Sequence, residues 1–181
     1  MNVCIFCGSA SGHNPVYKEA AQEVAKLLYD SNASLIYGGG NIGLMGAIAD
    51  ELMHLGGEVI GVIPDFLLQK EVGHKGITRL EVVNSMHERK RRMADLADVF
   101  IAIPGGWGTL DELAEILTWK QLGLISASIG ILNTNHYFDS LISQMNIMVS
   151  EGFLNPANLN ELQIAQTPHE LFNLLGIKPV K

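Results

Sequence analysis

The chain has 181 residues, and 48% of them are hydrophobic, which is enough for one globular domain with a substantial core. It carries 12 Lys and Arg against 19 Asp and Glu, and the net charge of -7 argues against a broad binding surface for nucleic acid or an anionic membrane. No basic leader precedes the first apolar run, and no stretch reaches the roughly 18 apolar residues that a membrane span needs. We therefore expect a single domain over residues 1–181, located in the cytoplasm, without nucleic-acid or membrane partners.

Short apolar runs alternate with amphipathic stretches along the chain. The pattern predicts strands at residues 2–8, 34–40, 58–64, 79–84, 98–104, 127–133 and near 162–166. It predicts helices at residues 15–29, 43–55, 85–97, 109–122, 137–150 and 168–175. This alternation is typical of an α/β fold, in which helices cover both faces of a parallel sheet. Residues 64–78 show no regular pattern, so we expect them to form a loop at the site or at a partner surface.

Cys4 and Cys7 form a C-x-x-C, a spacing found in redox pairs and zinc sites. No second cysteine pair completes a zinc site, and both thiols belong to an apolar strand-like segment, where free cysteine packs as a small hydrophobic residue. The six histidines are scattered, and no H-E-x-x-H occurs. We therefore expect neither a metal nor a cofactor.

Three loops rich in glycine or small residues follow predicted strands. They read CGSASG from Cys7, YGGGNIGLMG from Tyr37 and PGGWGTLDE from Pro104. Ligands of open parallel sheets bind beyond the carboxyl ends of the strands, so the three loops should meet at one edge. Helix N-termini at this edge offer free N–H groups and a partial positive charge, which can bind phosphate without lysine. The first two loops supply the candidate substrate contacts Ser9, Gly40, Met45 and Gly46.

The glycine loops match no standard nucleotide signature. Gly38-x-Gly40-x-x-Gly43 has the spacing of a dinucleotide-binding loop, but the acid expected about 20 residues on is Glu58, at the start of the next strand rather than its end. The Gly-Lys-Ser/Thr of a P-loop is absent. Two interpretations therefore stay open: the glycines receive an anion, or they only permit tight turns from strand to helix.

The segment SMHERKRRM, residues 85–93, places four cations at the start of a helix. Ser85 and Glu88 have the spacing of a capping box, so residues 89–92 crowd the first two turns, where the helix macrodipole opposes positive charge. Either an anion compensates, or the cluster is a solvated basic face paired with acids such as Asp95 and Asp98. The second explanation fits Arg89 least, because it lies only one turn from the cap.

Glu112 follows the third glycine loop and has two interpretations of its own. Thr109 and Glu112 also have capping-box spacing, so this carboxylate could reach back to the first amide of a helix that begins at Thr109. It could instead meet the sugar of a nucleotide whose phosphate lies in the glycine loop. Glu112 and Glu115 lie off the expected buried stripe of this helix, which consists of Leu110, Leu113, Ala114 and Leu117.

Two of these segments carry a family resemblance. PGGWGTLDE resembles the P-G-G-x-G-T-x-x-E motif, and SMHERK the M-H-x-R-K segment, of the LOG (Lonely Guy) family of cytokinin riboside 5'-monophosphate phosphoribohydrolases. The similarity continues through CGSASGHNPVY, YGGGNIGLMG and TWKQLG, and so covers nearly the whole chain. It implies a single Rossmann-like domain with a doubly wound parallel sheet, usually as a homodimer. Many members were once labelled lysine decarboxylases, but nothing here marks a pyridoxal-phosphate lysine with its supporting acid.

The resemblance also implies a reaction, in which N6-substituted adenosine monophosphates are split into the free base and ribose 5-phosphate. It assigns the catalytic roles to Arg89 and Glu112. The ionised carboxylate would stabilise positive charge on the ribose, and arginine, which cannot donate its proton at ordinary pH, would orient Glu112 and the nucleotide. Nucleotide contacts are implied at Glu71, Lys90, Gly106, Trp107, Gly108, Thr109, Leu110, Asp111 and Thr118. The interpretation of the glycine loop as an anion site adds Gly105.

Two alternatives to this reaction stay open. One is a broader purine or pyrimidine nucleoside monophosphate nucleosidase, since the large ring of Trp107 stands in the family's variable position. The other is a nucleotide-binding or carrier protein without catalysis, which the presence of both Arg89 and Glu112 disfavours.

Overall fold

The computed structural model describes residues 1–71 and 73–180, without the side chains of residues 69–71. Its strands are β1 (Asn2–Phe6), β2 (Ser34–Tyr37), β3 (Val59–Pro64), β4 (Arg79–Val83), β5 (Val99–Ala102), β6 (Ser128–Leu132) and β7 (Leu162–Ala165). Its α-helices are α1 (Val16–Asp30), α2 (Gly43–His54), α3 (Asp65–Glu71), α4 (Met86–Leu96), α5 (Trp107–Gln121), α6 (Asp139–Ser150), α7 (Pro156–Asn160) and α8 (Pro168–Leu174). A 3₁₀ turn, η1 (Thr134–His136), follows β6.

The seven strands form one parallel sheet in the order β4-β3-β2-β1-β5-β6-β7. The chain builds outward from β1 to β4, then returns to the other side of β1 and builds outward again to β7. Val3 of β1 therefore pairs with Leu35 on one side and Val99 on the other. The boundary between β1 and β5 is the topological switch point, where parallel α/β sheets place their ligands.

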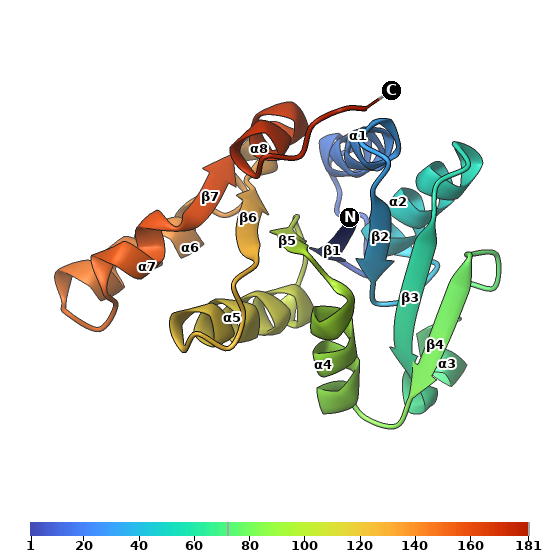
Figure 1. Cartoon of the computed structure of the whole chain (residues 1–181), viewed down its shortest axis with the longest axis horizontal. Helices are drawn as coiled ribbons and strands as arrows, with labels where there is room; N and C mark the ends of the chain where they lie inside the picture. The colour runs from blue at the N-terminus through green and yellow to red at the C-terminus, as the bar shows by residue number, and fades with distance from the viewer. Residues whose placement is uncertain (72, 181) are drawn as a thin grey trace.

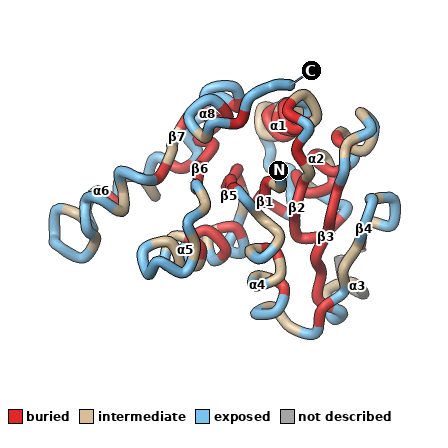
Figure 2. The backbone as a smooth tube through the Cα atoms, in the orientation of Figure 1, coloured by how far each residue is buried: buried red, intermediate tan, exposed pale blue. Residues whose placement is uncertain are grey.

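Helices cover both faces of the sheet, which confirms the predicted doubly wound α/β fold. Alternate residues of β1 enter two separate cores, with Val3 and Ile5 packing in one and Cys4 and Phe6 in the other. The first core includes residues of α1, α2 and α8, and the second includes residues of α4, α5 and α6. Figure 1 shows α1, α2 and α8 gathered on one side of the strands, with α4 and α5 on the other. Figure 2 shows that the buried segments follow the central strands.

The structure departs from the prediction at two short helices. Helix α3 occupies part of residues 64–78, where we expected a loop. Its seven residues were missed because the segment also contains Pro64, Gly73 and Gly76, which are typical of loops. Helix α7 was missed because its five residues are too few for a helical period, although Asn155 caps it and Pro156 opens it. With α6, α7 forms an arm that projects from the body beyond β7 and is largely exposed (Figures 1 and 2).

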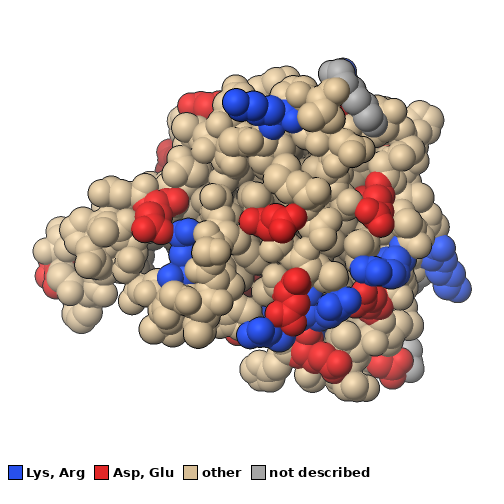
Figure 3. Space-filling model, viewed as in Figure 1, with Lys and Arg blue, Asp and Glu red and all other residues tan. Residues whose placement is uncertain are grey.

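No helix among the described residues is both long and apolar enough to cross a membrane. On the face shown in Figure 3, Lys and Arg side chains lie beside Asp and Glu side chains, while the projecting arm is largely uncharged.

Candidate active site

The loops that follow β1 and β5 meet at the switch point. Gly8 N donates a hydrogen bond to Pro104 O (3.1 Å), and Ile103 N donates to Phe6 O (2.9 Å), which ties the two strand ends together. A pocket of about 160 Å³ opens there. Eight residues predicted from the sequence line it: Ser9, Met45, Arg89, Gly106, Trp107, Gly108, Thr109 and Glu112. The prediction that the three glycine loops share one edge is thus confirmed.

Arg89 is held in the pocket by backbone carbonyls. It is only 7% exposed, its Nε donates to Val62 O (3.2 Å), and its Nη2 donates to Gly38 O (3.1 Å). A side chain on Gly38 would run into the guanidinium group, so this glycine provides the space for the arginine. Both acceptors are neutral, and among the described residues Arg89 forms no ion pair with a carboxylate. Its positive charge is therefore available to a bound anion.

The neighbouring cations of α4 each have an acidic partner instead. Arg91 pairs with Asp95 (2.8 Å) and Arg92 with Glu81 (2.6 Å), as the solvated-face explanation predicts. Asp98 forms no ion pair within the part of the chain that the structure describes, and its carboxylate accepts a hydrogen bond from Asn2 N instead. The two explanations thus apply to different residues: acids satisfy the outer cations, and Arg89 is left for the pocket.

The predicted cap of α4 is confirmed in one half. Ser85 Oγ accepts a hydrogen bond from Glu88 N (3.1 Å). The Glu88 carboxylate accepts from Asn84 N rather than from the amide of Ser85, so the reciprocal half of the capping box is shifted by one residue.

Glu112 lies in the same pocket as Arg89 and is only 8% exposed. Burial raises the pKa of this carboxyl to about 7, the charges of Arg89 and Lys90 oppose the rise, and those of Asp111 and Glu115 add to it. Glu112 therefore exchanges its proton near neutral pH, as is typical of a functional carboxyl.

The predicted capping box of α5 is wrong. The helix begins at Trp107 with Gly106 as its N-cap, two residues earlier than expected. Because glycine can cap without a side chain, Thr109 lies inside the first turn and Glu112 in the second, beyond reach of the first amide. This displacement frees the Glu112 carboxylate to line the pocket.

The N-terminus of α5 is open toward the pocket. Its first intrahelical hydrogen bond runs from Leu110 N to Gly106 O (3.2 Å), so the amides of Trp107, Gly108 and Thr109 lack acceptors within the helix. The Thr109 hydroxyl is buried without a hydrogen-bond partner among the described residues. A Cβ added to Gly106 or Gly108 would meet nothing within 4 Å. These features together form a concave site for an anion.

The remaining predicted residues lie outside the pocket, although Gly105 supports it by accepting a hydrogen bond from Tyr137 Oη (2.5 Å). Gly40 bridges to Gly73, and a side chain on Gly46 would run into the backbone of Asn41. Leu110 and Thr118 line a separate apolar groove of about 410 Å³ between α5, α6 and α7. Glu71 ends α3, and its side chain lies outside the described residues.

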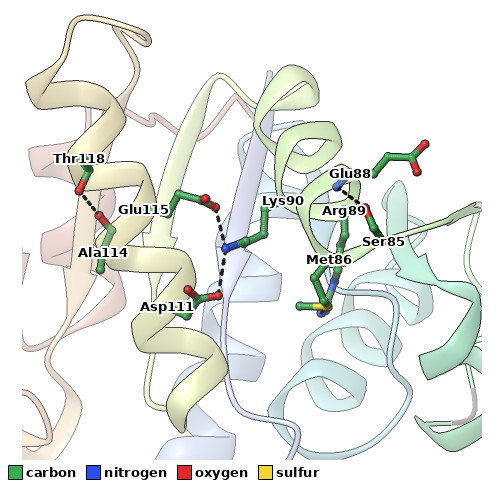
Figure 4. Close-up of polar contacts among 9 residues, drawn as sticks. All are labelled: Ser85, Met86, Glu88, Arg89, Lys90, Asp111, Ala114, Glu115 and Thr118. Carbon is green, nitrogen blue, oxygen red and sulfur yellow. Dashed lines mark hydrogen bonds and ion pairs between the residues drawn. The ribbon is translucent and has the colours of Figure 1, made fainter.

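Lys90 and Asp111 bind each other rather than facing the pocket. Lys90 Nζ lies 3.1 Å from Asp111 Oδ2 and 3.0 Å from Glu115 Oε2, and Figure 4 shows the lysine reaching from α4 to α5. Burial lowers the pKa of Lys90, but its hydrogen bonds to Glu115 and Asp111 outweigh that effect and raise the pKa above its usual value.

Sequence reasoning missed five residues at the pocket. Four of them line it, namely Ile5, Cys7, Gly8 and Gly38, and Tyr137, just after η1, braces the β5–α5 loop. The position of Cys7 and Gly38 just after two neighbouring strands was the available signal. Burial and the charge of Glu112 raise the pKa of the Cys7 thiol, which keeps it protonated. No group of three or more His, Cys, Asp or Glu in the described part of the chain could hold a metal ion.

Comparisons with known proteins found a matching family model, similar relatives and similar solved structures. The family model described as "Possible lysine decarboxylase" matches residues 45–175. A cytokinin riboside 5'-monophosphate phosphoribohydrolase of Arabidopsis thaliana is 43% identical over 173 residues, which are 96% of this chain and 81% of that protein. One from Oryza sativa subsp. japonica is 43% identical over 169 residues, or 93% and 70% of the two chains.

Solved structures share the fold at lower identity. The molybdenum cofactor binding protein of Rippkaea orientalis superposes with a TM-score of 0.70 at 21% identity, covering 97% of this chain and 93% of that one. The Moco carrier protein of Chlamydomonas reinhardtii gives a TM-score of 0.72 at 16% identity, with 97% and 94% covered. At such identities the likeness concerns the Rossmann-like fold alone.

Proposed function

Because this chain belongs to the LOG (Lonely Guy) family, whose model is described as "Possible lysine decarboxylase", we propose that it hydrolyses the N-glycosidic bond of adenosine 5'-monophosphates. The products are the free base, either adenine or an N6-substituted adenine of the cytokinin type, and ribose 5-phosphate. The enzyme is an N-glycosyl hydrolase and needs no cofactor.

The bound 5'-phosphate lies at the N-terminus of α5. The free amides of its first turn, the unpartnered Thr109 hydroxyl and the space around Gly106 and Gly108 support this assignment. The ribose then extends toward Glu112, one turn along the helix. Trp107 is 88% exposed at the mouth of the pocket, where its ring can pack against the base.

Glu112 and Arg89 carry the chemistry. As the bond from C1' to N9 breaks, positive charge develops on the ribose, and the buried Glu112 carboxylate stabilises it. Water adds its oxygen to C1' and loses a proton, and the departing base gains one. Arg89, which has no competing ion pair among the described residues, holds the anionic nucleotide and orients Glu112.

One observation carries this proposal: a buried carboxyl with a pKa near 7 and an arginine without an acidic partner share a pocket with an open helix N-terminus. The test is chromatographic release of base from a panel of nucleoside monophosphates. Glu112→Gln should lose at least about 100-fold in rate while its circular dichroism is unchanged. Arg89→Ala should also be severely impaired, and Asp95→Asn, which breaks an exposed pair on α4, is the control.

The same assay separates the alternatives. A folded Glu112→Gln enzyme with near-normal turnover would overturn the assignment of Glu112. Binding of nucleotides without release of base would favour a carrier, and equal rates with pyrimidine and purine monophosphates would favour a broader nucleosidase. Full activity in excess chelator is expected, and loss that a divalent ion restores would reveal a metal site.

The protein acts as a homodimer that packs through the groove of α5, α6 and α7. Supporting this, the groove is apolar, and Phe153 beside it is 87% exposed. Light scattering should report about twice 19.7 kDa, and Leu117→Asp should yield a monomer. Thr118 would lie in that interface, so a contact between Thr118 and the nucleotide of one copy would come from the second copy.

A cytoplasmic location suits the free thiols of Cys4 and Cys7.

A further inference from the structure

Lys90 forms the charged link between the helices that carry Arg89 and Glu112. Its Nζ contacts Asp111 Oδ2 and Glu115 Oε2 at 3.1 and 3.0 Å, and its side chain is only 12% exposed. Asp111 and Glu115 are one turn apart on α5 and flank Glu112 in the sequence (Figure 4). One lysine therefore spans the segment of α5 that contains Glu112.

The position of Lys90 connects these ion pairs to both residues assigned to catalysis. Arg89 precedes it on α4, so the ion pairs of Lys90 tie the turn that carries Arg89 to α5. Lys90, Glu112 and Glu115 line a small crevice between the two helices, together with Phe6, Ala94, Ile116 and Trp119. A second, more exposed contact joins the helices where the Arg91 guanidinium lies 5.8 Å from the Trp119 ring centre.

We propose that Lys90 is a positioning residue: by pairing with Asp111 and Glu115 it docks α4 on α5, keeps Arg89 and Glu112 in register, and neutralises the two carboxylates that flank Glu112. The family resemblance suggested instead that Lys90 touches the nucleotide. For its kinetic part, this inference rests on the proposed function.

The charges around Glu112 make the proposal testable by titration. Arg89 and Lys90 face it from α4, Asp111 and Glu115 from α5, and the thiols of Cys4 and Cys7 from β1 and the residue that follows it. Burial and the charge of Glu112 raise the pKa of both thiols, so they stay neutral and do not titrate with it. Removing Lys90 leaves two carboxylates unopposed, whereas removing Glu115 deletes one of them, and the two changes act on Glu112 with opposite sign.

The experiment follows the titration of Glu112 by carbon-13 NMR in protein labelled at glutamate, with Glu112→Gln identifying the signal. Lys90→Met should raise the midpoint, and Glu115→Gln should lower it, each by several tenths of a pH unit. In a plot of the rate of base release against pH, the acid limb should likewise move to higher pH in Lys90→Met and to lower pH in Glu115→Gln. At pH 9, where Glu112 is ionised in every variant, both should lose about 10-fold in kcat with little change in KM.

Two controls accompany these variants. Lys90→Arg keeps the charge and should restore the wild-type titration, and Asp95→Asn should change neither midpoint nor rate. Unmoved midpoints in Lys90→Met and Glu115→Gln would refute the proposal, as would a higher KM with normal kcat in Lys90→Met alone, which would indicate direct nucleotide contact. If the wild type released no base, the proposed function would fail, but the NMR midpoints would still test the link.

Discussion

Two glycine-rich loops follow strands at the same edge of the sheet, yet protein atoms fill one of them and leave the other open. In the β2–α2 loop, the amides of Leu44 and Met45 at the start of α2 donate to Gly8 O (3.1 and 3.3 Å). Side chains on Gly38 or Gly43 would run into Arg89 or the backbone of Ser9. The β2–α2 loop is therefore closed by the protein itself.

The β5–α5 loop is also rich in glycine, but two of its glycines, Gly106 and Gly108, have open surroundings. Nothing lies within 4 Å of a Cβ built on Gly106 or Gly108, the first amides of α5 have no intrahelical acceptor, and the Thr109 hydroxyl is buried without a partner in the described structure. Glycine content alone thus does not identify a ligand site. What distinguishes the two loops is whether the space that glycine leaves is already occupied, and this depends on neighbouring segments.

The largest effect expected from this difference is the dependence on phosphate. Charge-assisted hydrogen bonds to phosphate contribute roughly 1.5 to 3 kcal/mol each, so losing two or three should cost about 100-fold or more in kcat/KM. Adenosine and adenosine monophosphate should be compared under identical conditions by release of adenine. Equal values would mean that the β5–α5 glycines, like those of the β2–α2 loop, only shape a turn.

Gly106→Ala should separate ligand binding from folding. The φ of Gly106 is -99°, which alanine can adopt, and the free protein has room for the methyl group, so stability should change little. The methyl group would instead occupy the phosphate site and lower kcat/KM for the monophosphate by about 10-fold, or 1.4 kcal/mol. Adenosine cleavage should be unaffected. If Gly106→Ala lost stability and still preferred adenosine monophosphate to adenosine, the loop would not be open as described.

The β2–α2 loop should respond differently at two of its glycines. Gly38→Ala pushes on the ends of two flexible side chains, most closely on the Arg89 guanidinium and less closely on Met45 Sδ. The protein should therefore fold and lose about 10-fold in kcat because the arginine is displaced. Gly43 has a φ of +65° against the Ser9 backbone, so Gly43→Ala should cost at least about 1 kcal/mol of folding stability. Urea unfolding and rate assays on both variants check this, and a Gly38→Ala enzyme with full kcat would refute the role of Gly38.

The sequence predicted these features unevenly, for physical reasons. The alternation of apolar runs and amphipathic stretches located all seven strands, because five of them, β1, β2, β3, β5 and β6, are buried along most of their length. The edge strand β4 is partly exposed, but its apolar residues still mark it in the sequence. It could not show that β1 lies beside β5, since strand order depends on contacts between distant segments. The meeting of the β1 and β5 loops at the pocket therefore rested on a general rule for parallel sheets, and only the structure showed which helix N-terminus stays open.

Helix α5 shows where periodicity misleads. The predicted buried stripe included Leu110, Ala114 and Leu117, but these residues border the groove, and the buried face is that of Thr109, Glu112, Leu113 and Ile116. Helix α5 turns one apolar face toward the groove and another, functional face toward the edge of the sheet. The orientation of such a helix cannot be predicted from hydrophobicity alone. The pairing of Lys90 with α5 could not be predicted for a related reason, because its partners lie 21 and 25 positions along the chain.

The smallest effect concerns the stability cost of keeping Glu112 beside an open loop. Its pKa is about 7 in the folded protein against an ordinary 4.5, so between these values the folded state holds a proton that the unfolded chain has released. Stability therefore falls as pH rises through this window, and the cost is complete above pH 7. Glu112→Gln removes the charge and should unfold at higher denaturant concentration than the wild type at pH 8, by on the order of 1 kcal/mol.

At pH 5 most of that gain should disappear, because the wild-type carboxyl is then protonated in the folded state. Urea unfolding of both proteins at pH 5 and pH 8 measures the difference. A gain of equal size at the two values would point to better packing of the amide, and no gain at pH 8 would mean that the pocket solvates Glu112 well. A variant that is both inactive and more stable would show that this carboxylate is kept for catalysis at the expense of the fold.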